Sequence, residues 1–196
     1  MNPTPLLQEA LRRFDDENSQ DPNLVEADGT QVPRELLYAR WLTDWVLRLC
    51  PEASEPLRLA ARCQHLCRWQ IPRSSYEMNR VGYLKWRGDL KQFHARKSAE
   101  ILRDVGYPEE IIERVQQLNL KKNLGSAPEC QILEDALCLV TLQYQLEELI
   151  RKTPEDKMVE ILRKTWKKMS PTGRQFASEL SLSETAKRLV GEAIRD

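Results

Sequence analysis

The spacing of the apolar residues is the feature that most constrains the fold. Apolar side chains recur three and four positions apart along nearly the whole chain, as in ELLYARWLTDWVLRL at residues 35–49 and ILEDALCLV at residues 132–140. This spacing puts them on one face of an α-helix, whereas a half-buried strand needs strict alternation of apolar and polar residues. Alternating runs of β-branched residues are almost absent. We therefore predict an all-α protein.

Prolines, capping residues and glycine divide this pattern into separate helices. Pro33 and Pro51 bound one helix, and Ser54 caps the next. Pro72 ends that helix because proline cannot donate the next helical hydrogen bond. Gly106 stands where a long helix ends in the left-handed conformation. These boundaries predict a bundle of eight or nine helices, at about 4–15, 34–50, 55–69, 79–105, 108–120, 128–151, 153–169, from 170 onward and after 183.

The 196 residues fit one all-α domain with a single core. Within it, we expect residues 1–33 to form an N-terminal helix and a long polar loop, residues 34–152 the central part of the bundle, and residues 153–196 its C-terminal helices. The polar loop, at about 16–33, is longer than a simple connector. Loops of this length often serve a functional site.

Charge and hydropathy exclude several classes of protein. Thirty basic residues balance thirty acidic ones, so no net field attracts nucleic acid or an anionic membrane. No apolar run approaches the roughly 18–20 residues of a membrane span, and the first ten residues, MNPTPLLQEA, lack the pattern of a signal peptide. The five cysteines favour reduced thiols over disulfides. We expect a soluble, cytoplasmic protein with no membrane partner.

A few polar residues interrupt the apolar pattern and mark a candidate site. The acids Glu134 and Asp135 stand inside an apolar segment, so at least one carboxylate points inward and needs a cation, hydrogen-bond donors or a metal. His65 lies near the end of the helix LRLAARCQHLCRW, and His94 in the middle of a long helix. A helical histidine is often a buried residue satisfied by a neighbour. Here the surrounding polar residues favour a site.

Basic and aromatic residues follow His65 closely. Arginine binds phosphate oxygens in pairs, and an aromatic face can stack on a base or a sugar. This composition predicts a phosphorylated small molecule or nucleotide as the ligand. The alternative is that Arg68 pairs with Asp15 or Asp21 and that the tryptophans belong to the core. The residues that we predict to bind the ligand are Gln64, Arg68, Trp69, Arg73, Tyr76 and Lys121.

One dense basic run, RKTWKKMSPTGR at residues 163–174, is compatible with binding to nucleic acid. Lysines at this spacing more often form a solvated helix face. The sequence contains no glycine-rich phosphate loop and no GxSxG motif. Their absence argues against kinases, dinucleotide enzymes and serine hydrolases.

The order of the segments resembles the HD-domain superfamily of metal-dependent phosphohydrolases. The similar segments are ELLYARWLTDWVLRL, LRLAARCQHLCRW, HARKSAEILRDVGYPEEIIERV and ILEDALCLV. In that superfamily the ligands are a histidine, a His-Asp pair and a later aspartate. On this pattern Glu35 replaces the histidine, Gln64 and His65 replace the pair, and Asp135 is the aspartate. A register shifted by one matches His65 and Leu66 to the pair and implies a fold without a metal.

A second resemblance runs through the entire chain. The segments QHLCRWQIPRSSY, GYLKWRGDLKQFHA, ILEDALCLV and ILRKTWKKMS are similar to a family designated domain of unknown function 4202. This resemblance supports the all-α fold and implies that the unusual polar residues belong to a family pattern. It implies no substrate.

Two functions follow as hypotheses. The first is a divergent HD-like hydrolase of a phosphorylated small molecule or nucleotide, in which Glu35, His65, His94 and Asp135 hold a divalent transition metal (Mn, Fe or Zn). Glu134 would then be the catalytic residue that orients or deprotonates a water molecule. The second is a non-catalytic module that binds a nucleotide, RNA or a protein on a degenerate HD-like fold. The oligomeric state stays open.

Overall fold

The computed structural model describes residues 4–27, 29–121 and 127–195. These residues form ten α-helices and one short β-hairpin, so the all-α prediction is confirmed. The helices are α1 (Pro5–Asn18), α2 (Arg34–Leu49), α3 (Glu55–Cys63), α4 (Arg80–Val105), α5 (Glu109–Asn119), α6 (Pro128–Val140), α7 (Leu146–Lys152), α8 (Glu155–Lys168), α9 (Pro171–Ser178) and α10 (Glu184–Ile194). The strands are β1 (Leu24–Ala27) and β2 (Thr30–Pro33), and the short turns are η1 (Arg68–Gln70), η2 (Arg73–Ser75) and the π-helical segment η3 (Thr141–Gln145).

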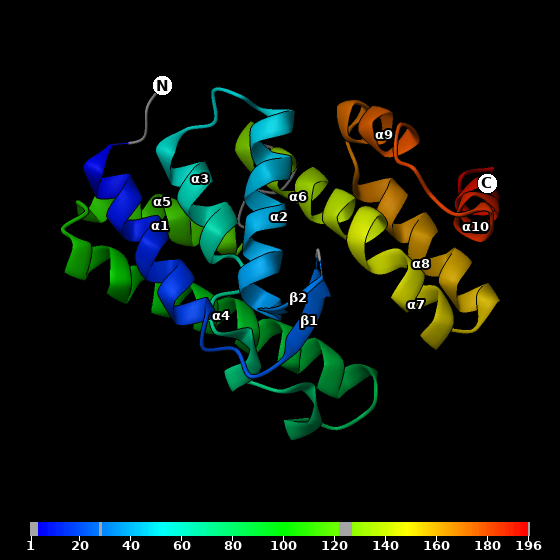
Figure 1. Ribbon diagram of the computed structural model, residues 1–196, viewed down its shortest axis with the longest axis horizontal. Helices are drawn as coiled ribbons and strands as arrows, with labels where there is room; N and C mark the ends of the chain where they lie inside the picture. Colours follow the sequence, from blue (N-terminus) through cyan, green and yellow to red (C-terminus); the bar gives the residue numbers. More distant parts are fainter. Residues whose placement is uncertain (1–3, 28, 122–126, 196) are drawn as a thin grey trace.

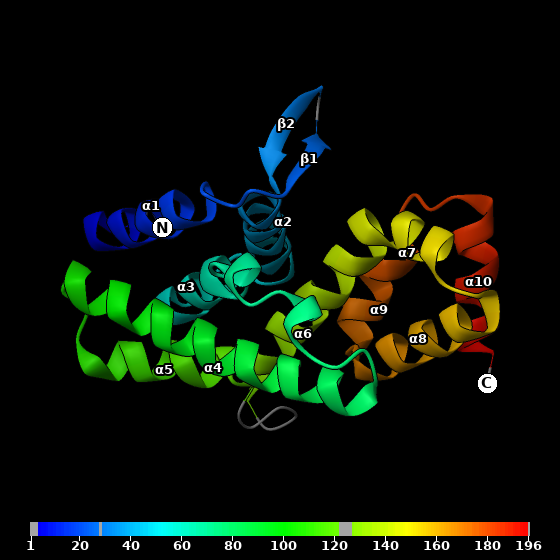
Figure 2. The ribbon, with the colours of Figure 1, turned by 90° about the horizontal axis from the view of Figure 1, so that it is seen from below.

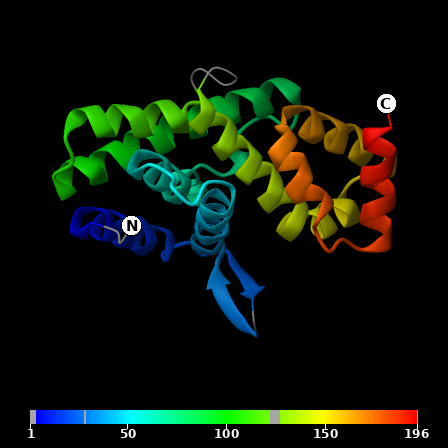
Figure 3. The same cartoon turned by 90° about the horizontal axis from the view of Figure 1, so that it is seen from above.

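The helices form two groups that α2 and α6 join. Helices α1, α3, α4 and α5 lie together at one end of the molecule, and α7 to α10 lie at the other (Figure 1). Helix α2 packs on α3 and on α6, and α6 also packs on α8 and α9. The hairpin projects from the body (Figures 2 and 3). Within the described residues, no helix is both long and apolar enough to cross a membrane.

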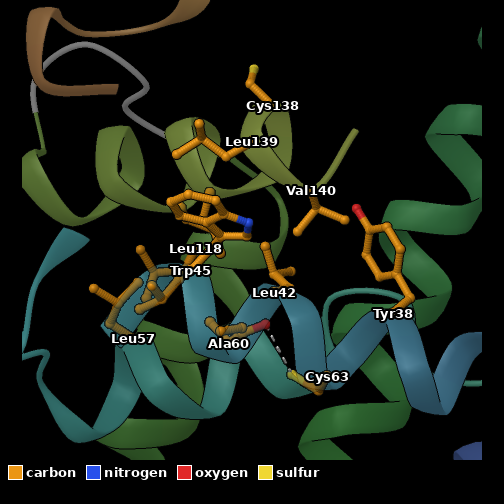
Figure 4. Close-up of a cluster of buried hydrophobic side chains, with 14 of the residues drawn as sticks. Tyr38, Leu42, Trp45, Leu57, Ala60, Cys63, Leu118, Cys138, Leu139 and Val140 are labelled. Carbon is orange, nitrogen blue, oxygen red and sulfur yellow. Dashed lines mark hydrogen bonds between the residues drawn. The ribbon is translucent and has the colours of Figure 1, made fainter. Parts of the chain in front are cut away.

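The hydrophobic core follows the helical spacing of the sequence. Leu42 and Trp45 of α2 lie three positions apart and are both buried, facing Leu139 of α6 (Figure 4). Burying a side chain of this size stabilises a fold by about 1.5–3 kcal/mol. The indole nitrogen of Trp45 also donates a hydrogen bond to Gln143 Oε1 at 2.8 Å. These contacts fix α2 against α6, and both helices contribute residues to the site described below.

The prediction of a loop over residues 16–33 is wrong. Helix α1 extends to Asn18, and residues 24–33 form an antiparallel hairpin in which Val25 faces Val32. The available signal was the Asp-Gly pair between LVEA and TQVP, a typical hairpin turn. Gly29 has a φ of 75°, which glycine adopts without steric cost. Asp28 lies outside the described residues.

The helix predicted over residues 55–69 ends earlier, at Cys63. The chain then turns, and Cys67 adopts a left-handed φ of 54°. The backbone N–H of Cys67 donates to the buried Asn18 Oδ1 at 3.0 Å, and its thiol donates to Glu17 Oε2 at 3.3 Å. These bonds to α1 offset a conformation that costs about 1–2 kcal/mol. The turn brings the residues after Cys67 to the site.

Candidate functional site

A cavity of about 720 Å³ lies between α4 on one side and α6, α7 and α8 on the other. The N-terminal turn of α2, the turn after α3 and Lys121 complete its wall. It brings together most of the predicted site residues. Those that line it are Glu35, Gln64, His65, Arg68, Trp69, Arg73, His94, Lys121 and Glu134. Tyr76 and Asp135 do not line it.

The lining of the cavity is strongly basic. Three acidic residues line it, namely Glu35, Glu134 and Glu148. Eight basic residues line it, namely Arg34, Arg68, Arg73, Arg87, Lys91, Lys121, Lys152 and Lys168. Arg87 and Lys91 form no ion pair with any residue in the described part of the chain. Burial, followed by the charges of Lys121 and Arg87, lowers the pKa of Lys91. The cavity therefore has a positive potential that an anionic ligand would neutralise.

His65 lies on the wall of the cavity between a carboxylate and a guanidinium. Its ring stacks on Tyr38 with the ring centroids 4.2 Å apart. Its Nδ1 atom is 3.4 Å from Glu35 Oε2, and its Nε2 atom is 3.5 Å from a guanidinium nitrogen of Arg68. Burial and then the positive charges of Arg68 and Arg87 lower its pKa well below the ordinary value. His65 is therefore neutral at pH 7.

His94 is buried at the middle of α4 and has a defined tautomer. Its Nδ1 atom is 2.9 Å from the carbonyl oxygen of Leu66. Because a carbonyl only accepts hydrogen bonds, Nδ1 carries the proton. Burial and then the neighbouring His65 lower the pKa of His94 to about 3. The Nε2 atom therefore keeps its lone pair, and it is buried without a hydrogen-bond partner among the described residues.

Glu35 reaches the cavity from the first turn of α2, which begins directly after Pro33. Its backbone N–H donates to the buried Asp21 Oδ2 at 3.0 Å, so the segment before β1 holds the start of the helix. Burial raises the pKa of Glu35, while the charges of Arg68 and Arg34 oppose this shift. Its Oε2 atom has no hydrogen-bond partner in the described part of the chain.

Glu134 points into the cavity from α6 and pairs with Lys121. Burial alone would raise the pKa of Glu134, but the ammonium groups of Lys121 and Lys168 outweigh burial and lower it. Lys121 has a left-handed φ of 55°, an uncommon conformation for a residue with a side chain. Lys121 lines the cavity from this position, two residues after the end of α5.

Asp135 lies on a different face of α6 from Glu134. It accepts hydrogen bonds from Ser170, the residue that caps α9. Its Oδ1 atom accepts hydrogen bonds from the backbone N–H of Ser170 at 2.8 Å and from Gln131 at 3.0 Å, and the Ser170 hydroxyl donates to Oδ2. Gly173 packs so closely that an added Cβ would lie 2.6 Å from the Asp135 carboxyl carbon. We predicted that at least one of Glu134 and Asp135 points inward and needs a cation, donors or a metal. Hydrogen-bond donors satisfy Asp135, and Lys121 pairs with Glu134.

The four residues that we predicted as metal ligands are not assembled as a set. Glu35, His65 and His94 line the cavity, but Asp135 does not. Within the described residues, no group of three or more histidine, cysteine, aspartate and glutamate side chains is placed to hold a metal ion. Three such protein ligands are the usual minimum for a catalytic transition metal. The residues therefore do not fit the predicted metal centre.

Several ligand-binding candidates are occupied by bonds within the protein. Arg73 donates to the carbonyl oxygens of Tyr76 and Glu77, and the Tyr76 hydroxyl donates to Asp89 Oδ2 at 2.9 Å. Both residues hold the segment before α4 in place. Trp69 lies in the wall of the cavity with its ring half-buried.

Sequence reasoning also missed several residues of the wall. Tyr38 was not recognised as a site residue, because its partner His65 is distant in the sequence and lies in the turn after α3. Lys168 belongs to the basic run 163–174, which we had assigned to a solvated face or to nucleic acid. The π-helical segment η3 supplies Thr141 and Gln145. Interruptions of this kind are frequent at functional sites.

Comparisons with known proteins give one family and no relative of established function. The profile of the family described as Domain of unknown function (DUF4202) matches residues 8–190. No curated protein and no solved structure matches the chain. The resemblance to the HD-domain superfamily therefore stays a prediction. The match covers nearly the whole chain, and the protein belongs to the DUF4202 family.

Proposed function

We propose that the protein binds a phosphorylated small molecule, such as a sugar phosphate or a nucleotide, in the basic cavity. The observation that carries the proposal is the excess of basic over acidic residues in the lining, with Arg87 and Lys91 left without an ion pair in the described part of the chain. Phosphate oxygens are the acceptors that guanidinium and ammonium groups bind best.

The shape of the site also favours a small molecule over a macromolecule. A cavity of about 720 Å³ falls within the usual range of small-molecule pockets, roughly 300–1,000 Å³. Trp86 forms part of the wall. The guanidinium carbon of Arg68 lies 4.8 Å from the centroid of its ring, and its indole nitrogen donates a hydrogen bond to the Ile71 carbonyl oxygen at 2.9 Å. A rigid wall of this kind suits the recognition of a compact ligand.

The test is calorimetric titration of the purified protein with inorganic pyrophosphate and with a panel of nucleotides and sugar phosphates. Arg87→Gln and Lys91→Gln should each weaken pyrophosphate binding about tenfold, since a charge-assisted hydrogen bond contributes about 1.5–3 kcal/mol. Lys85→Gln is the matched control, because Lys85 lies on the same helix but is exposed and does not line the cavity. Equal affinities in all three variants would refute the proposal.

Hydrolysis of the bound phosphate ester is a second candidate function, and the position of His65 beside Glu35, with Nδ1 3.4 Å from Oε2, favours it. A neutral imidazole next to a carboxylate can accept a proton from water. A bound phosphate would also offset the positive charges that contribute to the low pKa of His65. This function needs no metal ligand set, and it replaces Glu134 by His65 as the group that accepts the proton.

A phosphate-release assay on the same panel separates the two functions. If the protein is a hydrolase, His65→Gln should retain ligand binding and lose turnover by about a hundredfold or more, the usual contribution of a general base. A protein that binds a ligand tightly and releases no phosphate from any compound in the panel would be a binding module instead.

A further inference from the structure

Three buried acceptor atoms of cavity-lining residues have no hydrogen-bond partner in the described part of the chain. They are Gln64 Oε1, His94 Nε2 and Glu35 Oε2, which lies 3.4 Å from His65 Nδ1 without forming a hydrogen bond to it. The three residues are 5%, 2% and 7% exposed, respectively. Buried polar groups are almost always hydrogen-bonded, and an unpaired one costs about 1–3 kcal/mol. Three unpaired acceptors in one cavity therefore indicate a place for a group that donates hydrogen bonds.

All three atoms can accept a hydrogen bond but cannot donate one. A glutamate carboxylate has no proton to donate, and an amide oxygen accepts only. The remaining atom, His94 Nε2, is an acceptor because the proton of the neutral ring is on Nδ1, facing Leu66. A phosphate group cannot satisfy them, because its ionised oxygens are acceptors as well. The ligand must therefore present donors to this part of the cavity and phosphate oxygens to the basic part.

The surrounding charges indicate which kind of donor fits. Arg68 lies 3.9 Å from Glu35 and close to His65, and Arg34 and Arg87 also line the cavity. Positively charged donors, such as ammonium groups, would be repelled by these guanidinium groups. A hydroxyl group is neutral and donates one hydrogen bond, so it satisfies an acceptor without adding positive charge.

The two parts of the cavity are close together on α4. Lys91 and His94 are three positions apart, so they are separated by about 4.5 Å along the helix axis, and Arg87 is about 10 Å from His94 along the same axis. A short carbon chain with hydroxyl groups and a terminal phosphate is long enough to reach both parts.

We propose that the ligand is a phosphorylated polyol, whose hydroxyl groups donate to Glu35, Gln64 and His94 while its phosphate faces Arg87 and Lys91. This assignment rests on the proposed function and adds the substrate class to it. A free sugar phosphate and the ribose phosphate of a nucleotide share this chemistry.

The experiment compares matched ligands on the wild-type protein by calorimetry. Ribose 5-phosphate, glucose 6-phosphate and glycerol 3-phosphate are each titrated against the alkyl phosphate of equal chain length, namely pentyl, hexyl and propyl phosphate. Inorganic pyrophosphate reports on the basic part alone, and AMP on the nucleotide form. At least one of the polyol phosphates or AMP should bind tenfold or more tightly than its alkyl analogue, with pentyl phosphate as the analogue for AMP.

Two variants assign the preference to the acceptor atoms. Gln64→Met removes one acceptor at nearly constant volume and should reduce the preference for the polyol phosphate over its alkyl analogue several-fold. Arg87→Gln should weaken the polyol phosphate and the alkyl phosphate alike. Because the ligand comparison uses the wild-type protein, it stays decisive even if Gln64→Met fails to fold.

The failures of the two proposals are distinguishable. If pyrophosphate and the alkyl phosphates bind and no hydroxylated ligand exceeds its analogue, the polyol assignment is wrong and the phosphate site stands. If 5-aminopentyl phosphate binds more tightly than ribose 5-phosphate, the donor is an ammonium group and the assignment is equally wrong. If neither pyrophosphate nor any phosphate ester binds, the proposed function fails, and the polyol assignment fails with it.

Discussion

The Nδ1 atom of His94 donates a hydrogen bond to the carbonyl oxygen of Leu66, 2.9 Å away. This bond joins the middle of α4 to the turn that follows α3, and the same turn carries Gln64, His65 and Arg68 into the cavity. It also fixes which nitrogen of His94 is protonated. One buried bond therefore sets both the position of the turn and the chemistry of a site residue.

The stability of the protein should fall in acid through His94. Its pKa is about 3 in the folded state because of burial and the neighbouring His65, against an ordinary value of 6.5. The unfolded chain therefore binds a proton that the folded chain does not, and between pH 6.5 and 3 the free energy of unfolding decreases by up to about 1.4 kcal/mol per pH unit. Urea unfolding at pH 7, 6 and 5 measures this loss.

His94→Asn isolates the contribution of His94 to this loss. The asparagine amide can still donate to Leu66 but does not titrate, so the stability of the variant should approach that of the wild type as the pH falls. A pH dependence identical in the two proteins would show that His94 does not take part.

Replacement of Asp135 should affect stability and leave ligand binding unchanged. Asp135→Ala leaves the partly buried N–H of Ser170 without this acceptor, so we expect the free energy of unfolding to fall by about 1–3 kcal/mol. Pyrophosphate affinity should match the wild type, because Asp135 does not line the cavity. A loss of pyrophosphate affinity with unchanged stability would show that Asp135 takes part in binding.

Replacing only Lys121 of the Lys121–Glu134 pair should destabilise the protein more than replacing both residues. Lys121→Met leaves a buried carboxylate with only the more distant Lys168, at 3.8 Å, so we expect a loss of about 3 kcal/mol at pH 7. The loss should shrink at pH 4, where Glu134 without its partner can take up a proton. Chemical unfolding of Lys121→Met and of Lys121→Met with Glu134→Leu checks this: the double variant should regain most of the stability.

Pyrophosphate binding should weaken as salt increases. Eight basic residues line the cavity, and its mouth is open to solvent at exposed residues such as Arg34, Lys152 and Lys168, so added ions screen part of the attraction. We expect the dissociation constant to rise between 0.05 and 0.5 M NaCl, on the order of severalfold, and to rise less steeply in Lys91→Gln. Affinity independent of salt would mean that the bound anion does not contact the basic residues.

Most of the helices could be predicted from the sequence alone. Apolar spacing of three and four predicted α2, α4 and α5 closely, and Gly106, with a φ of 98°, ends α4 where predicted. Helices are local structures, because each backbone bond closes within four residues. The basic and aromatic residues around His65 were found for the same reason, since they are neighbours in the chain. The hairpin was missed because its strands have only four residues each, too few for an alternating pattern to stand out.

Which polar residues meet could not be predicted, because it depends on how the helices pack. Glu134 and Asp135 are adjacent in the sequence, and a helix rotates by about 100° between neighbours, so either carboxylate was a candidate for the site. The packing of α6 turns Glu134 towards Lys121 and the cavity, and Asp135 towards Ser170 and α9. The stacking of Tyr38 on His65 could not be predicted either, since it joins α2 to the turn after α3. Contacts between elements depend on how the whole core packs, and helical spacing carries no information about that.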